Sequence, residues 1–279
     1  MEDPRAAELE LVAARTTGAV ASEELVDATV PAFLLRRYLS TDAPELREPL
    51  GLALAQALAW AADETSVIGR SAWLALLVEA TAAADDERIR PAAEELIAGL
   101  RAAWPAQTRI DEASVSVEAC LRAAAIVDAD GLIQDAIDQL ERIVGGSYRP
   151  GDGLLRDRDG VRVRASLGDH VWAASALLTA FELTGRLPYS MLAEELIVIA
   201  RRAPSSAAGL RIECGVARVL CRLAALHDDP DYRGAAVIAG GADYRAEASR
   251  ILAGQSPCIG SATASDAAAY GLALLDLLK

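Results

Sequence analysis

The chain has 279 residues, of which 53 % are hydrophobic and only 4 % aromatic, and its formal net charge is −14. This length and apolar content are enough for one large domain with a substantial core, and they argue against a disordered chain. The negative charge excludes nucleic acid and anionic membranes as expected partners, because both bind positively charged faces. Ala and Leu outnumber Val and Ile, which favours helices over strands.

In chain order, the sequence is a succession of amphipathic segments separated by turn-forming and N-capping residues. Pro31 falls inside the second segment, where we expect it to break the helix. The twelve segments form six consecutive pairs. The predicted helices cover residues 5–17, 22–39, 44–62, 70–84, 88–103, 112–128, 130–144, 169–184, 188–203, 208–227, 242–253 and 263–278.

An internal repeat organises these pairs. A Leu anchor is followed after 12 and after 16 residues by two further apolar, aromatic or small residues, with a turn before the first of them. The steps between anchors are 43, 44, 56 and 43 residues. Such units suit helical hairpins and exceed the ~34 residues of a tetratricopeptide repeat. The anchors are Leu34, Leu77, Leu121, Leu177 and Leu220.

Six hairpins of this length nearly fill the chain. We therefore predict a single all-α domain over residues 1–279, an (α/α)6 toroid in which one helix of each pair lines an inner wall. The alternative is an open solenoid of the HEAT kind. The two differ in whether the first and last helices pack together.

The one long step contains the stretch "GLLRDRDGVRVRA", residues 153–165, in which the apolar period falls to two. Asp159-Gly160 is typical of a type I′ turn, so we predict a short β-hairpin insertion near 153–165. It would belong to a tongue, residues 146–168, that lies over one mouth of the toroid at the working face. If the valines of its second strand pack on the ring, Arg162 and Arg164 project together, as suits a carboxylate or phosphate.

Metal and cofactor sites are not expected. Asp157 and Asp159 do not complete an EF-hand, because its first and twelfth positions would be Leu155 and Ser166. The four cysteines have no zinc spacing and are expected to be core thiols.

The chain is expected to be cytoplasmic, because we find no signal peptide and no apolar run long enough to span a membrane. Lys279 is the only lysine, and all other cations are arginines. This bias indicates a bacterial or archaeal source with a GC-rich genome.

From residue 153 onward, "GLLRDRDGVRVRASLGDHVWAASALLTAFELTGRLPYSMLAEEL" resembles the toroid region of the spermatogenesis-associated, thioredoxin-domain-containing family. "ARVLCRLAALHDDPDYRGAA" and "ASDAAAYGLALLDLL" are similar to the end of that region. The resemblance implies a six-hairpin glycosidase-like toroid and a thioredoxin-like partner, but no defined reaction. The chain departs from the family pattern, since Gly168-Asp169-His170 replaces its Asp-Asp-Tyr and no redox pair of cysteines is present.

The helix after the tongue begins with Asp169, His170 and Trp172. A polar and aromatic mouth suited to a sugar could combine these residues with others from the tongue. Two simpler roles stay open: Asp169 as the helix N-cap, and His170 as a surface residue. The ligand-binding candidates near the tongue are Tyr148, Arg162, Arg164, Asp169, His170 and Trp172.

A glycosidase needs two carboxyl groups about 5–9.5 Å apart. Glu118 and Glu213 are each isolated in an apolar run and are therefore candidates for the inner wall. They lie three residues before Leu121 and seven before Leu220, and this mismatch argues against a matched pair.

Two functional hypotheses follow. The first is a pocket for a sugar or a sugar-derived anionic ligand, with or without catalysis. It predicts a deep central pocket with two convergent acids, or with one acid and His170. The alternative is a non-catalytic interaction scaffold that works with a thioredoxin-like protein. It predicts an axis filled by Leu, Ala and Trp.

Overall fold

The structure, a computed structural model, describes residues 4–22, 27–127, 129–202, 209–236 and 238–279. Thirteen α-helices lie in this described part of the chain, and none of them is long and apolar enough to cross a membrane. They are α1 (Pro4–Ala21), α2 (Thr29–Thr41), α3 (Arg47–Asp63), α4 (Val67–Ala80), α5 (Ile89–Ala103), α6 (Ile110–Ala123), α7 (Leu132–Ser147), α8 (Leu167–Thr184), α9 (Leu187–Arg202), α10 (Leu210–Asp228), α11 (Pro230–Ala236), α12 (Tyr244–Gln255) and α13 (Ala264–Leu277).

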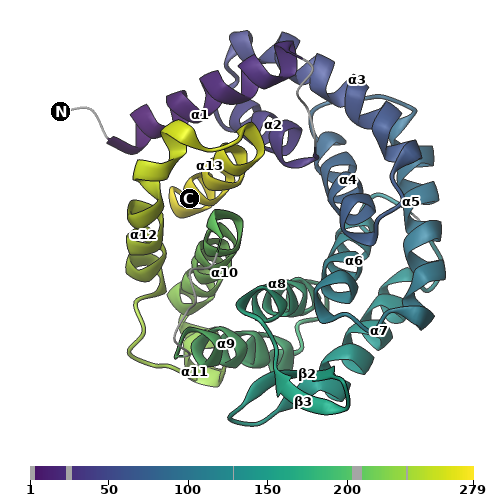
Figure 1. Cartoon of the computed structure of the whole chain (residues 1–279), viewed down its shortest axis with the longest axis vertical. Coiled ribbons are helices and arrows are strands. Elements are labelled where there is room, and N and C mark those ends of the chain that lie inside the picture. The colour runs from purple at the N-terminus through teal and green to yellow at the C-terminus, as the bar shows by residue number, and fades with distance from the viewer. Residues whose placement is uncertain (1–3, 23–26, 128, 203–208, 237) are drawn as a thin grey trace.

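The helices form two concentric rings (Figure 1). The inner ring consists of α2, α4, α6, α8, α10 and α13, and the outer ring of α1, α3, α5, α7, α9 and α12. The ring is closed, because α13 packs against both α1 and α2. Across this seam the Tyr270 hydroxyl donates to Glu8 Oε2 at 2.6 Å. The predicted (α/α)6 toroid is confirmed, and the open solenoid is excluded.

Most predicted helices agree with the structure, with three differences. Pro31 lies in the first turn of α2 and does not break it, because the missing amide of a proline costs nothing there. The predicted second helix began too early: α1 continues to Ala21, and α2 starts at Thr29. The short helix α11 was not predicted. Residues 23–26, 128, 203 and 208, which the predicted helices included, lie outside the described residues.

The predicted hairpin is also confirmed. β2 (Gly153–Arg158) pairs antiparallel with β3 (Val161–Arg164) around the predicted type I′ turn, in which φ is 55° at Asp159 and 80° at Gly160. The Gly160 amide donates to Asp157 Oδ1 at 2.8 Å, so the turn is capped by its own strand. A third short strand, β1 (Tyr148–Arg149), pairs with β2 and was not predicted.

Three of the four cysteines are free and buried, as expected for core thiols, and burial raises the pKa of the Cys120 thiol to about 12. Cys258 is exposed, so the core prediction is wrong for this residue. It lies in a 3₁₀ segment, Ser256–Ser261, whose only buried residue is Ile259.

Candidate functional site

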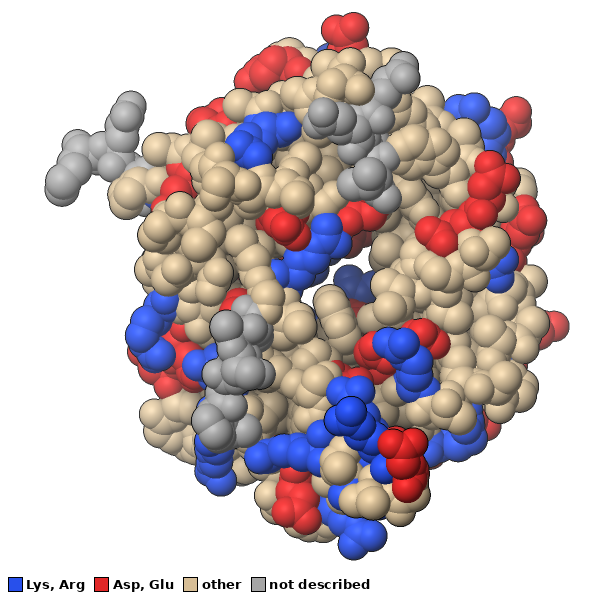
Figure 2. Space-filling model, viewed as in Figure 1, with Lys and Arg blue, Asp and Glu red and all other residues tan. Residues whose placement is uncertain are grey.

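The axis of the toroid is an open cavity of about 810 Å³. Side chains from all six inner helices line it, together with Trp60 of α3. Figure 2 shows the hollow at the centre of the ring, with acidic and basic side chains inside it. The scaffold hypothesis predicted an axis filled by apolar side chains, and that prediction is wrong.

The inner helices present the same repeat positions to the cavity. Counted from the Leu anchors, the residues five before, two before and two after recur in the cavity lining, with the one exception that Thr179 of α8 is not a lining residue. In the third copy the anchor position is occupied by Cys120, one residue before the predicted Leu121. The sixth copy, for which no anchor was predicted, has Leu274 at this position. Residues spaced by three and four lie on one face of a helix, so each inner helix contributes one side chain to each of three layers.

The layers differ sharply in chemistry. The upper layer, nearest the start of the inner helices, is mostly small and apolar, with one indole: Thr29, Ala72, Val115, Trp172, Gly215 and Ala269. The middle layer is polar on α6, α8 and α10 only: Ala32, Ala75, Glu118, Ser175, Arg218 and Leu272. The layer at the far end, here called the charged layer, is polar throughout: Arg36, Glu79, Arg122, Thr179, Arg222 and Asp276.

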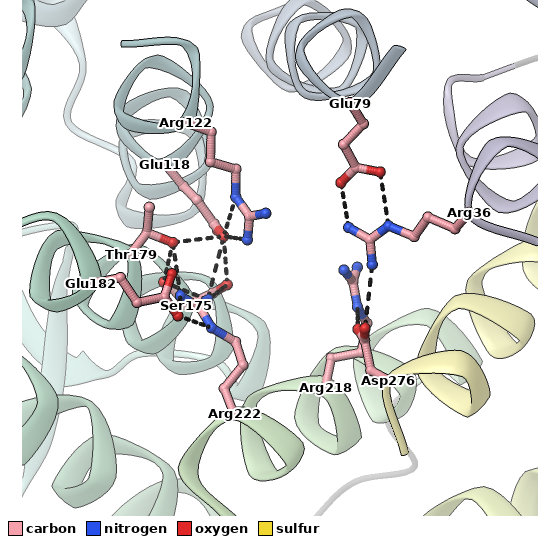
Figure 3. Close-up of polar contacts among 10 residues, drawn as sticks. All are labelled: Arg36, Glu79, Glu118, Arg122, Ser175, Thr179, Glu182, Arg218, Arg222 and Asp276. Atoms are coloured by element: carbon pink, nitrogen blue, oxygen red, sulfur yellow. Dashed lines mark hydrogen bonds and ion pairs between the residues drawn. The ribbon is translucent and has the colours of Figure 1, made fainter. Parts of the chain in front are cut away.

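On one side of the charged layer, Arg36 joins two carboxylates (Figure 3). Its Nε donates to Glu79 Oε2 at 2.8 Å, and its Nη1 donates to Asp276 Oδ1 at 3.4 Å. Arg218 approaches the same Asp276 through Nε, at 2.8 Å from Oδ2. Burial raises the pKa of both carboxyl groups, but the arginine charges outweigh it and hold each pKa below its usual range. Both groups therefore stay ionised.

On the other side, Glu118 is the hub of a second cluster (Figure 3). Its Oε1 accepts from Arg122 Nη2 at 2.7 Å, from the Ser175 hydroxyl at 2.9 Å and from the Thr179 hydroxyl at 3.2 Å. Arg222 Nη1 lies 3.6 Å from the same oxygen. Burial raises the pKa of Glu118, but the charges of Arg122 and Arg222 outweigh it and lower that pKa to about 2.

One mouth of the cavity lies at the end where the inner helices begin. Arg211 at the start of α10 bridges Asp27, at 2.8 Å, and Asp266, at 2.7 Å. Against the effect of burial, the Arg211 charge lowers the pKa of Asp27. Burial also raises the pKa of Asp111, but the contact with Arg109 helps to lower it below its usual range. The charged residues at this end are Asp27, Asp63, Glu64, Asp111 and Arg211.

The tongue does not cover this mouth. It lies at the edge of the ring beside α7, α8 and α9 (Figure 1), and none of its described residues lines the cavity. The prediction that residues 146–168 close over the mouth is therefore wrong. A contact at the root of the tongue accounts for this: Leu154 is fully buried there, and its amide donates to His170 Nε2 at 3.0 Å. This contact turns the hairpin outward.

Asp169 has a structural role. Ser166 is the N-cap of α8, and Asp169 is the third residue of the helix. The two form a capping box in which each side chain accepts a hydrogen bond from the other residue's backbone amide. Arg156 Nη2 also donates to Asp169 Oδ2 at 2.7 Å. The predicted role of Asp169 as the N-cap is therefore wrong: the N-cap is Ser166, and Asp169 stabilises the same helix start from position N3.

His170 is buried, so its predicted alternative as a surface residue is wrong. Its Nδ1 lies 2.8 Å from the Ser166 carbonyl oxygen, which requires the proton on Nδ1 and leaves Nε2 free to accept from Leu154. Burial lowers the pKa of His170, so the imidazole is neutral at physiological pH. Gly153, with φ of 80°, lies so close that an added Cβ would stand 2.7 Å from Nε2.

The remaining candidates are divided between the cavity and the rim. Glu118 and Trp172 line the cavity, whereas Glu213 of α10 does not. Tyr148 donates its hydroxyl proton to Glu195 of α9 at 2.9 Å. On β3, Arg162 and Arg164 are exposed, and Arg164 Nη2 donates to the Ile199 carbonyl at 3.3 Å.

The expected packing of the β3 valines is wrong for Val161, which is 61 % exposed at the tip of the hairpin. Val163 is half-buried. The hairpin therefore rests on the ring through its root and leaves its tip in solvent.

Replacing His170 by Ala should destabilise the root of the tongue. The variant leaves the buried Leu154 amide without an acceptor, which costs about 1–3 kcal/mol of unfolding free energy. Hydrogen exchange of residues 153–165, with chemical denaturation, measures both effects. Val161→Ala at the exposed tip is the control and should change stability by less than about 0.5 kcal/mol. Equal protection of the tongue in the His170 variant and the wild type would contradict this role.

Comparison with known proteins places the fold. The α-1,6-mannanase of family GH76 from Salegentibacter sp. HEL1_6 superposes with a TM-score of 0.64 at 11 % identity, over 90 % of this chain and 87 % of that one. The unsaturated glucuronyl hydrolase from Bacillus sp. GL1 superposes with a TM-score of 0.67 at 12 % identity, over 89 % and 84 %. This chain has the fold of the six-hairpin glycosidase toroids. No known family model and no curated protein sequence matches it.

Most of the charges in the cavity were missed by the sequence analysis, yet a signal for them exists. Arg36, Glu79 and Arg222 each lie two residues after a Leu anchor, inside helices whose other faces are apolar. Arg218 and Ser175 lie two residues before one. Comparing the polar residues at equal positions of the repeat would have identified this wall.

Proposed function

We propose that the central cavity binds a carbohydrate. The observation that carries the proposal is the cavity itself, whose volume of about 810 Å³ is typical of small-molecule sites. Its upper part offers the indole of Trp172, with Trp60 near the mouth, as apolar surfaces for the C–H faces of a sugar ring. Its lower part offers carboxylates and guanidinium groups that suit hydroxyl groups.

The similar folds support the same ligand class. An inactive variant of the Salegentibacter mannanase was solved in complex with α-1,6-mannotetrose, so a ring of this architecture can hold an oligosaccharide. The other superposed enzyme is described as responsible for the degradation of glycosaminoglycan. Both are remote in sequence, and the proposal for this chain therefore depends on its own cavity.

We propose recognition without hydrolysis. A glycosidase needs a carboxylic acid that still carries its proton near neutral pH, which requires a raised pKa. In the described cavity wall, every carboxyl group whose pKa is displaced is displaced downward, by neighbouring arginines or by backbone amides. These groups are ionised and can accept hydrogen bonds from a sugar. They are Asp27, Glu64, Glu79, Asp111, Glu118 and Asp276.

A thermal-unfolding screen of neutral and acidic mono- and disaccharides tests this proposal. A ligand at a hundred times its Kd should stabilise the protein by about 2.7 kcal/mol. Trp172→Ala should abolish most of that stabilisation, whereas Trp172→Phe, which keeps an aromatic face, should retain it. Chromatography of the same mixtures should show intact sugars. Unchanged stability with every sugar would contradict binding, and cleaved disaccharide would contradict recognition without hydrolysis.

The thioredoxin-like partner remains a proposal that rests on the resemblance to the spermatogenesis-associated family. The cytoplasmic location and the bacterial or archaeal source remain predictions from the sequence. A partner protein could bind the outer ring while the cavity stays open, so this proposal and carbohydrate binding are compatible.

A further inference from the structure

Among the described arginines of the middle and charged layers, Arg218 has two terminal nitrogens without a hydrogen-bond partner, whereas Arg122 has one, Nη1. Arg218 belongs to the middle layer, and its side chain is 32 % exposed to the cavity space. Its Nε is held by Asp276, but its two terminal nitrogens donate to no residue in the described part of the chain. By contrast, all three nitrogens of Arg36 and of Arg222 make hydrogen bonds. Figure 3 shows the guanidinium group of Arg218 beside that of Arg36, where both meet Asp276.

The charges around Arg218 do not balance. Four arginines and three carboxylates of the middle and charged layers line the cavity, an excess of one positive charge within these two layers. The whole cavity lining holds five arginines and seven carboxylates, because Arg211 and four further carboxylates lie at the end where the inner helices begin. Glu182 contacts Arg222, but it is 54 % exposed and does not line the cavity. Burial lowers the pKa of Arg218, and the charge of Arg36 lowers it further. The seven residues are Arg36, Arg122, Arg218, Arg222, Glu79, Glu118 and Asp276.

We infer that Arg218 forms an anion subsite that takes the carboxylate of an acidic sugar, with the sugar ring in the upper layer against Trp172. This inference rests on the proposed carbohydrate binding and specifies its ligand. Two free nitrogens on one planar guanidinium match the two oxygens of a carboxylate. One excess positive charge matches a monoanion, whereas a phosphate ester carries roughly −1.5 to −2 at neutral pH.

Calorimetric titration with D-glucuronate and D-glucose tests the subsite, because the two sugars differ only in a carboxylate at one carbon. We expect the wild type to bind glucuronate at least tenfold more tightly than glucose. Arg218→Gln should remove this preference by weakening the binding of glucuronate more than that of glucose, since the charge-assisted hydrogen bonds are lost only for the anion. Arg218→Lys keeps the positive charge but lacks the two guanidinium nitrogens that bind both carboxylate oxygens, so it should recover part of the preference for glucuronate. Arg250→Gln, on the exposed face of α12, is the matched control and should bind like the wild type.

The alternative outcomes are distinct. Equal affinity of the wild type for both sugars would overturn the subsite and leave the proposed function standing, whereas absence of binding by either sugar would overturn both. Tighter binding of glucose 6-phosphate than of glucuronate would contradict the charge count. If Arg162→Gln removes the preference and Arg218→Gln does not, the tongue holds the anion and the inference is wrong. Circular dichroism checks that each variant is folded, and Arg218→Lys decides the question if the Gln variant is not.

Discussion

Replacing Glu118 by Gln is expected to lower the free energy of unfolding by about 3 kcal/mol at pH 7, among the larger effects for a single substitution. The amide keeps the size of the side chain and one acceptor oxygen, but it removes the negative charge between Arg122 and Arg222. Two guanidinium groups are then left in the cavity wall without their common counter-ion. Breaking a buried pair from one side is costly for this reason.

The same substitution makes a prediction about pH. The pKa of Glu118 is lowered to about 2 in the folded protein, below its value in the unfolded chain. As the pH falls, the unfolded chain therefore binds this proton first. The stability that Glu118 contributes is complete above about pH 4.5 and is lost toward pH 2. Urea unfolding at pH 7, 5 and 3 should show a large difference between the wild type and Glu118→Gln at the two higher values and a smaller one at pH 3.

Glu182→Gln is the matched control for this experiment. Glu182 also pairs with Arg222, at 2.9 Å, but its side chain is 54 % exposed. Exposed ion pairs contribute less than about 1 kcal/mol, so this variant should be close to the wild type. An equal loss in the two variants, or a difference at Glu118 that does not shrink with pH, would contradict the hub role.

Replacing Gly271 by Ala is expected to destabilise the protein by about 1–3 kcal/mol, although Ala is the better helix former. Gly271 lies on α13 where the ring closes. A Cβ there would stand 2.5 Å from Phe33 Cε2 on α2 and 2.9 Å from Val12 Cγ1 on α1. Phe33 and Val12 are fully buried, so neither can move aside without disturbing the seam.

Gly51→Ala is the matched control for this seam. Gly51 is exposed on the outer helix α3, and an added Cβ would meet no atom within 4 Å. The same chemical change should therefore stabilise the protein, by about 0.5–1 kcal/mol. Chemical denaturation of both variants measures the contrast. If Gly271→Ala also stabilises, the seam is looser than the contacts of α13 indicate.

The parts of the fold that depend on local pattern could be predicted from the sequence. Helical spacing, the turn residues and the repeat of about 43 residues predict six hairpins, and their number predicts a ring. Asp159-Gly160 predicts a type I′ turn because that turn needs a positive φ at both central residues, which this pair adopts readily. None of these features requires knowledge of distant contacts.

The direction of the tongue and the composition of the cavity wall could not be predicted in this way. The tongue turns outward because Leu154 and His170 meet across 16 residues, which no local pattern reports. For the cavity wall, an error of one residue was decisive. Taking Leu121 as the anchor placed Glu118 three residues before it, a position at which no other copy of the repeat has a polar residue. With Cys120 as the anchor, Glu118 falls in the same layer as Ser175 and Arg218.

The central claim is that the cavity on the axis of the ring is the ligand site, and the indole resonances of the four tryptophans test it most directly. Trp60, Trp73 and Trp172 line the cavity, whereas Trp104 is buried away from it, with its indole nitrogen 3.0 Å from the Ser116 hydroxyl. In ¹⁵N-correlated spectra recorded during titration with D-glucuronate, the Trp172 and Trp60 signals should move together, and the Trp104 signal should stay in place. Four stationary indole signals, or movement of Trp104 alone, would contradict the account.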